Sequence, residues 1–282
     1  MYFLIDKNNK ILWGWSAKAA CNHVKIMWNY FHNVNKLVPG LKTGASVHDG
    51  SYLSFPTNLT STKKEFRHQW TVILFVRNPY SRLVSGYVEK YCWRIKSSGA
   101  GHHNYNVRFS MINSFRNFVD ELERNGFKNI NNHHFVPQLT EGWNDVCVPN
   151  KVYDIGNINY EHLENRFDKK LPKEILESGR THSIKYTDRK EYVYDADFPN
   201  YVIGDFENQH LNNVPRYQYF YDDELKEKVT KIFKKDLDYF KQYGFDYESE
   251  LKVGPTKSSN YPTFLSNGKQ RIFKLKRLKV NG

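Results

Sequence analysis

Two short segments of the sequence place basic side chains where a chain can bind phosphate. The first is Ser16–Asn22 (SAKAACN), a run of small residues around Lys18. Small side chains let the backbone approach an anion, and the lysine adds a mobile positive charge. The second contains Arg77, which is followed by Asn78 and Pro79. Both segments predict contacts to a phosphorylated ligand.

Each segment lies between a predicted strand and a predicted helix. Ile11–Trp15 (ILWGW) and Thr71–Val76 (TVILFV) are apolar runs typical of buried strands. His23–Asn35 carries apolar residues at helical spacing, and Asn78 with Pro79 is a typical helix start. Open α/β sheets bind anions where a strand ends at a helix N-terminus, because unpaired N–H groups and the helix dipole point at the ligand.

The spacing of the Arg77 segment resembles a known nucleotide-binding motif. Arg77, Pro79, Arg82, Ser85 and Tyr87 form the pattern R-x-P-x-x-R-x-x-S-x-Y, which resembles the 3′-phosphate motif of sulfotransferases, specifically the Golgi carbohydrate branch. The resemblance implies that Arg77 and Ser85 bind the 3′-phosphate of 3′-phosphoadenosine 5′-phosphosulfate (PAPS). The alternative is an amphipathic helix that carries a solvent-exposed arginine.

The Lys18 segment resembles the 5′-phosphosulfate loop of the same family, P-K-x-G-x-T. It differs in having Ala17 for proline, Ala20 for glycine and Asn22 for threonine or serine. Alanine in the glycine position predicts a negative φ there. The resemblance implies that Lys18 neutralises charge at the reacting group and that the 5′-phosphate is bound by the loop residues Ala19, Ala20, Cys21, Asn22 and His23. The glycines of a Walker A sequence are missing.

Two histidines are candidates for the base that accepts the proton of an acceptor hydroxyl. His48 lies in the turn-rich stretch Gly40–Phe55, and His134 lies in Asn131–Gln138 (NNHHFVPQ), which resembles the H-[W/F]-x-P segment of carbohydrate sulfotransferases. Imidazole titrates near neutral pH, as a general base requires. The sequence does not separate the two, and Glu89 is a third candidate.

Three further helices and one strand complete the predicted fold. The helices are Met111–Phe127 with Gly126 as its stop, Tyr160–Phe167, and Asp222–Tyr243 before Gly244; the third core strand and its turn are Tyr153–Gly156. The segment Tyr153–Phe167, which contains this strand and the helix Tyr160–Phe167, resembles the Y-D-x-I-G-x-x-E-x-L element of the family with one extra residue. The resemblance implies a three-layer α/β/α fold with a central, mostly parallel sheet and a P-loop-like nucleotide site. We expect a sulfotransferase domain over 1–250 and a basic extension over 251–282.

Composition restricts the class of partner. The 282 residues carry a net charge of +12, which calls for an anionic ligand. The three cysteines are scattered, and the adjacent His102 and His103 have no third ligand at helical spacing, so no metal site is predicted. No apolar run approaches the roughly 20 residues of a membrane span, and no signal peptide is evident. We therefore expect a cytoplasmic protein, or one of the Golgi lumen if the chain is part of a longer, anchored protein.

The sequence thus predicts a PAPS-dependent sulfotransferase that acts on a hydroxyl acceptor, with carbohydrate or acidic glycan as the expected class and nucleic acid not expected. One alternative is a P-loop phosphotransferase, which needs a Walker A lysine and a magnesium-binding carboxylate. The other is a non-enzymatic domain that binds polyanions or nucleic acid through the basic surface. The oligomeric state stays open.

Overall fold

The computed structural model describes residues 2–6, 8–33, 70–92, 114–127, 133–139, 148–178, 192–194, 216–253 and 277–279. The chain forms two compact units. The first consists of Met1–Asn78, Pro137–Ser183 and Asp238–Phe245, and the second of Pro79–Val136, Ile184–Leu237 and Asp246–Gly282. Within the described residues, no helix has both the length and the apolar character needed to cross a membrane.

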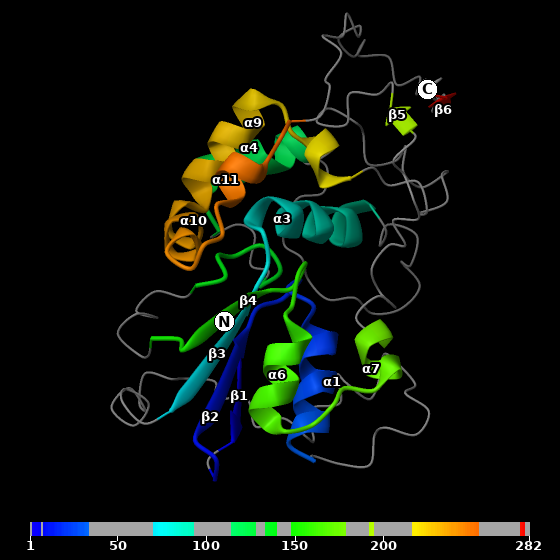
Figure 1. The fold of residues 1–282 in the computed structure, drawn as a ribbon. Helices are drawn as coiled ribbons and strands as arrows, with labels where there is room; N and C mark the ends of the chain where they lie inside the picture. The colour runs from blue at the N-terminus through cyan, green and yellow to red at the C-terminus, as the bar shows by residue number, and fades with distance from the viewer. Residues whose placement is uncertain are drawn as a thin grey trace, which may run out of the picture. The chain divides into compact units, whose positions relative to one another are not determined.

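The first unit is built on a four-stranded sheet with the order β1-β2-β3-β4 (Figure 1). A hairpin pairs β1 (Tyr2–Asp6) with β2 (Ile11–Trp15) in antiparallel fashion, and β2, β3 (Thr71–Val76) and β4 (Lys151–Asp154) are parallel neighbours. The predicted mostly parallel sheet is confirmed. Because parallel strands end at one edge, the residues that follow β2 and β3 lie close together in this unit.

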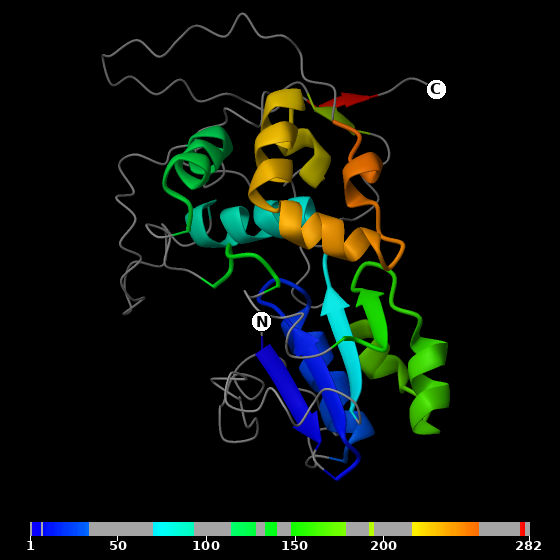
Figure 2. The same cartoon turned by 90° about the vertical axis from the view of Figure 1, so that its left-hand side faces the viewer.

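One face of this sheet is covered by helices α1 (Cys21–Phe31), α6 (Tyr160–Phe167) and α7 (Lys173–Ser178). Figures 1 and 2 show α1 and α6 side by side on that face. Trp13 of β2 is fully buried there, with ring centroids 5.3 Å from Trp28 and 4.9 Å from Phe75. The predicted apolar stripe of α1 is confirmed, since these members are all buried: Val24, Met27, Trp28 and Phe31. Leu12, Leu74 and Val76, which alternate with the residues of that face, are buried as well, whereas a three-layer arrangement stays a prediction.

The second unit is largely helical in its described part. Its main helices are α3 (Pro79–Tyr87), which continues as a π-helix over Val88–Cys92, α4 (Phe115–Asn125), α9 (Asp223–Ile232) and the short α11 (Tyr247–Glu250). Apolar and aromatic residues at helical spacing along α3 are buried: Tyr80, Leu83, Val84 and Tyr87. Strands β5 (Tyr192–Tyr194) and β6 (Arg277–Lys279) pair in antiparallel fashion, and β6 lies in the stretch predicted as a basic extension. The predicted domain boundary stays a prediction.

Helix ends follow the local chemistry of the chain. Ser114 caps α4 by accepting a hydrogen bond from the Asn117 N–H, and Gly126 ends the helix at φ 60°. Asp222 caps α9 in the same way through the Leu225 N–H. The predicted single helix Asp222–Tyr243 is two helices, because α9 ends before Phe233 and α10 (Lys234–Lys241) begins after it.

Candidate functional site

The loop that carries Lys18 makes a tight turn between β2 and α1. Ser16, Ala17 and Ala19 are buried, and the Ala19 N–H donates to Ser16 O at 3.1 Å. Lys18 and Ala20 both have left-handed backbone, with φ 66° and φ 48°. The prediction of a negative φ at Ala20 is therefore wrong. The turn from strand to helix requires the left-handed conformation at this position, and alanine adopts it at a cost of roughly 1–2 kcal/mol.

The N-terminus of α1 has the features of an anion-binding helix end. Ala20 is the N-cap residue, and no side chain in the described part of the chain caps it. The first helical hydrogen bond is that from the Val24 N–H to Ala20 O, at 3.0 Å, and the first turn contains no acidic residue. The first N–H groups of a helix have no acceptor inside it and carry partial positive charge. Left-handed backbone on either side of Ala19 adds a concave turn of the kind that binds anions.

Arg77, directly after β3, reaches this loop. Its Nη1 donates to Lys18 O at 2.9 Å, so the two basic segments predicted from the sequence are joined by a hydrogen bond. Both segments follow parallel strands that are neighbours in the sheet. The structure thus brings the Arg77 side chain and the backbone of the Lys18 loop together at the carboxyl edge of β2 and β3, and the ligand contacts predicted for them stay predictions.

A glutamine that the sequence did not single out connects the same two strand ends. The Gln138 Oε1 accepts from the Arg77 N–H at 2.9 Å and from the Ser16 hydroxyl at 3.3 Å. Its Nε2 donates to Arg77 O at 2.6 Å, and the side chain is only 1% exposed. A lone glutamine after a proline has no periodicity that would mark it, and the only signal was its place at the end of the NNHHFVPQ segment.

His23 is a structural histidine in the first turn of α1. Its Nε2 is 3.0 Å from the Tyr160 hydroxyl, and desolvation lowers the pKa of His23 to about 4. The imidazole is therefore neutral at physiological pH. Among its neighbours in the loop, the Cys21 thiol is 3.7 Å from Asn22 Oδ1. The backbone N–H groups of this turn suit a phosphate contact, and the contacts predicted for its residues stay predictions.

Ser85 and Arg82 lie on α3 in the second unit, where Ser85 is half-buried. Arg82 is 1% exposed, and its Nη1 and Nη2 donate to Val136 O at 2.8 Å and to His133 O at 3.4 Å. The alternative of a solvent-exposed arginine is therefore wrong for Arg82, which fixes the segment next to His134. The phosphate contact of Ser85 stays a prediction.

The three candidate bases have different positions. His134 is half-buried, and its ring centroid is 4.1 Å from that of His133, whose pKa is lowered by desolvation and by the Lys90 and Arg82 cations. The Glu89 carboxylate forms an ion pair with the Lys90 ammonium, with 2.8 Å between Oε1 and Nζ. His48 lies outside the described residues, as do His102 and His103.

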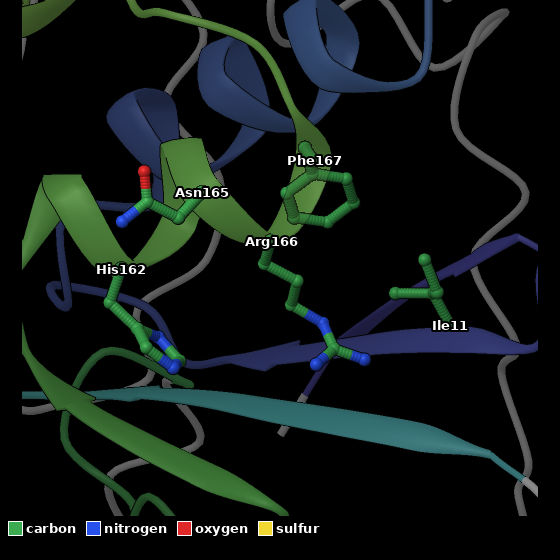
Figure 3. Close-up of a pocket in the computed structure, with 5 residues that line it drawn as sticks. All are labelled: Ile11, His162, Asn165, Arg166 and Phe167. Carbon is green, nitrogen blue, oxygen red and sulfur yellow. The ribbon is translucent and has the colours of Figure 1, made fainter.

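A separate pocket of about 490 Å³ lies at the amino end of β2 (Figure 3). It is lined by Ile11, His162, Asn165, Arg166 and Phe167 and contains none of the predicted site residues. Arg166 Nη2 donates to the Thr71 hydroxyl at 2.6 Å, and His162 Nδ1 is hydrogen-bonded to the Tyr153 hydroxyl. These bonds hold α6 on the strands. Among the described side chains, no cluster of three or more His, Cys, Asp or Glu is arranged to hold a metal.

Comparison with known proteins places the chain in a family. No curated protein and no solved structure gave a match. A family model described as "Sulfotransferase family" matches residues 1–244 of the 282. The match includes the whole of the Lys18 loop, Arg77 and Gln138, which form the hydrogen-bonded edge described above. With most of its length matched, including both basic turns, the chain belongs to the sulfotransferase family.

Proposed function

We propose that this sulfotransferase uses PAPS as the donor and transfers the sulfuryl group to a hydroxyl of a carbohydrate acceptor. The observation that carries the proposal is the 2.9 Å hydrogen bond between Arg77 Nη1 and Lys18 O, which joins two basic turns at the carboxyl edge of parallel strands. A donor with phosphate at both ends needs two such turns at a fixed separation. The resemblance to the Golgi carbohydrate branch supports the acceptor class.

The residues of the first unit suit the 5′ end of this donor. The N–H groups at the start of α1 have no side-chain cap among the described residues, and backbone N–H groups are the usual ligands of a 5′-phosphate. Lys18, in the same turn, supplies a positive charge beside them. We expect the Lys18 ammonium to neutralise negative charge that develops on the leaving oxygen during transfer.

Arg77 and Ser85 are proposed to bind the 3′-phosphate, on the strength of the sequence motif. A guanidinium has five N–H donors, so the bond to Lys18 O is compatible with a second contact to phosphate. A charge-assisted contact of this kind contributes roughly 1.5–3 kcal/mol. Bound PAPS supplies the activated sulfuryl group, and the chain's task is to align the acceptor hydroxyl with it and to stabilise charge.

The base is proposed to be His134 or His48. Glu89 is less suited, because its carboxylate is engaged by the Lys90 ammonium. The net charge of +12 supports an acidic glycan as acceptor, since an anionic polymer is attracted to a basic surface. Nucleic acid is not expected.

The donor assignment is tested by ligand-induced stabilisation. 3′-Phosphoadenosine 5′-phosphate (PAP) and AMP differ only in the 3′-phosphate. At equal ligand concentration, the ligand with the lower dissociation constant for the folded state raises the melting temperature more. We expect PAP to raise it more than AMP. Equal shifts, or none, would contradict the 3′-phosphate site.

Two serines on α3 provide a matched pair of variants. Ser85→Ala should reduce the difference between the rises in melting temperature that PAP and AMP cause. Ser81→Ala, one turn earlier and also half-buried, should leave that difference unchanged. Arg77→Ala should weaken the binding of both nucleotides, because it also removes the hydrogen bond to the Lys18 loop. A narrowed difference in both serine variants would assign the effect to the helix rather than to Ser85.

A further inference from the structure

We propose that Gln138 is a positioning residue that sets the separation of the two donor-binding turns. The inference rests on the proposed function, because it concerns the site that binds the two ends of PAPS. The side chain of Gln138 is bonded to the backbone of Arg77 and to the hydroxyl of Ser16, so its role is to act on the ligand through these groups.

The amide of Gln138 pairs with Arg77 as a neighbouring strand would. Its Oε1 accepts the Arg77 N–H at 2.9 Å, and its Nε2 donates to Arg77 O at 2.6 Å. Both polar groups of the residue that follows β3 are thus satisfied by one side chain. A Gln138 amide with its O and N exchanged would place NH₂ against N–H, so these bonds fix its orientation.

The third bond of Gln138 extends this constraint to β2. The Ser16 hydroxyl donates to the same Oε1 at 3.3 Å, and Ser16 is the first residue after β2. Arg77 Nη1 in turn donates to Lys18 O at 2.9 Å. A chain of hydrogen bonds therefore runs from Ser16 through Gln138 and Arg77 to Lys18, and it joins the turn for the 5′-phosphate to the turn for the 3′-phosphate.

Burial makes this arrangement stiff. Gln138 is 1% exposed and Ser16 is 3% exposed, so water cannot readily replace a broken bond. A buried polar group left without its partner loses its hydrogen bonds to water with nothing to replace them, which destabilises the arrangement. The two turns therefore cannot separate or slide without leaving several buried groups unpaired, and their spacing is fixed before a ligand arrives.

A fixed spacing matters most for a ligand that contacts both turns. PAP has phosphates at both ends, whereas AMP has only the 5′-phosphate. A misplacement of about 1 Å can cost about 100-fold in the rate of a reaction. Binding of a ligand that must reach both turns depends on the same alignment. Loss of the Gln138 amide should therefore weaken the binding of PAP much more than the binding of AMP. A general loss of protein stability would not distinguish the two nucleotides.

The test measures the dissociation constants of PAP and AMP by calorimetry, well below the melting temperature of each protein. In Gln138→Met, which keeps the length of the side chain but removes its amide, we expect the PAP constant to rise at least about tenfold and the AMP constant less than about threefold. Gln138→Glu keeps an acceptor for the Arg77 N–H and provides a second variant if Gln138→Met does not fold; we expect the same order of effects.

Asn150 provides the matched control. Its Oδ1 accepts from the Val72 N–H at 2.6 Å, so it makes the same type of bond to the same strand, β3, but at the amino end. Asn150→Ala should lower stability and leave the ratio of the two constants within about twofold of wild type. An unchanged ratio in a folded Gln138 variant, or an equal change in Asn150→Ala, would overturn the positioning role. A wild-type protein that does not distinguish PAP from AMP would instead contradict the proposed function.

Discussion

At the scale of single residues, Ala20 carries an avoidable backbone cost. Its φ of 48° is in the left-handed region, where an alanine is disfavoured by roughly 1–2 kcal/mol. Glycine removes that cost but adds roughly 0.5–1 kcal/mol of backbone entropy to the unfolded chain. We therefore expect Ala20→Gly to raise the free energy of unfolding by about 0.5–1 kcal/mol, measured by urea denaturation.

Ala19 serves as the control for that substitution. It is fully buried, and its φ is not positive, so glycine there removes a packed methyl group and relieves nothing. Ala19→Gly should lower the free energy of unfolding by about 1 kcal/mol. Destabilisation by both substitutions would show that Ala20 does not hold the left-handed conformation.

Lys18 is expected to act on the reacting group rather than on nucleotide binding. Lys18→Ala should lower kcat about 100- to 1,000-fold, as loss of one charge-stabilising group does, and should change the dissociation constant of PAP only a few-fold, since PAP lacks the sulfuryl group. Lys10→Ala is the control, because Lys10 also has left-handed backbone (φ 52°) but lies in the β1–β2 hairpin. Normal turnover in a sulfuryl-transfer assay of Lys18→Ala would contradict the assigned role.

The residues predicted from the sequence differ in how well pattern could find them. Lys18 and Arg77 were found because each follows an apolar strand, and the parallel order of β2 and β3 then brings them together. Gln138 was missed because its partners are backbone groups far away in the sequence, and no spacing reports such bonds. The prediction of a negative φ at Ala20 is wrong because the turn, rather than the residue type, decides the sign of φ there.

At the scale of elements, α3 and the segment around His134 fit together through one glycine. A Cβ on Gly86 would lie 2.8 Å from Phe135 Cε1, and the Phe135 ring is buried, with its centroid 4.8 Å from that of Phe118. Overpacking of this kind costs about 1–3 kcal/mol, while alanine gains up to about 1 kcal/mol of helix propensity. We expect Gly86→Ala to lower the free energy of unfolding by about 1–2 kcal/mol.

A double-substitution cycle shows whether contact with Phe135 is the cause. Phe135→Leu shortens the side chain that the new methyl group would meet, at its own cost in packing. The double variant Gly86→Ala/Phe135→Leu should therefore be more stable than the sum of the single effects predicts, by at least about 0.5 kcal/mol. Additive effects would mean that Gly86 and Phe135 do not meet.

Prediction of elements succeeded where apolar spacing was continuous and bounded. Tyr160–Phe167 matches α6, and α3 begins at Pro79 as expected. The division of Asp222–Tyr243 into α9 and α10 is not predicted from the sequence, because one buried apolar stripe continues across the break. Its members are Leu225, Val229, Phe233, Leu237 and Phe240. Periodicity reports which side is buried and does not report a local break in the backbone.

At the scale of the whole molecule, sequence patterns predict an α/β fold with a mostly parallel sheet but do not predict the order of its strands. β1 and β2 form a local hairpin, but the parallel pairing of β2 with β3 and of β3 with β4 joins segments far apart in the sequence, which no local pattern encodes. Membership of the sulfotransferase family is independent of that order and agrees with the predicted chemistry.

His23 makes the stability of the whole fold sensitive to mild acid. Desolvation lowers its pKa from the ordinary value of 6.5 to about 4, so between these pH values the unfolded chain binds a proton that the folded chain does not. Stability must then fall as the pH falls through this window, by up to about 3 kcal/mol. His23→Gln can keep a hydrogen bond to the Tyr160 hydroxyl without titrating. We expect urea denaturation at pH 7.5 and pH 4.5 to show a loss about 2–3 kcal/mol larger in the wild type than in this variant. His32, whose pKa burial also lowers, titrates in both proteins and cancels in the comparison, so an equal loss in the two would exclude His23 as the acid-sensitive group.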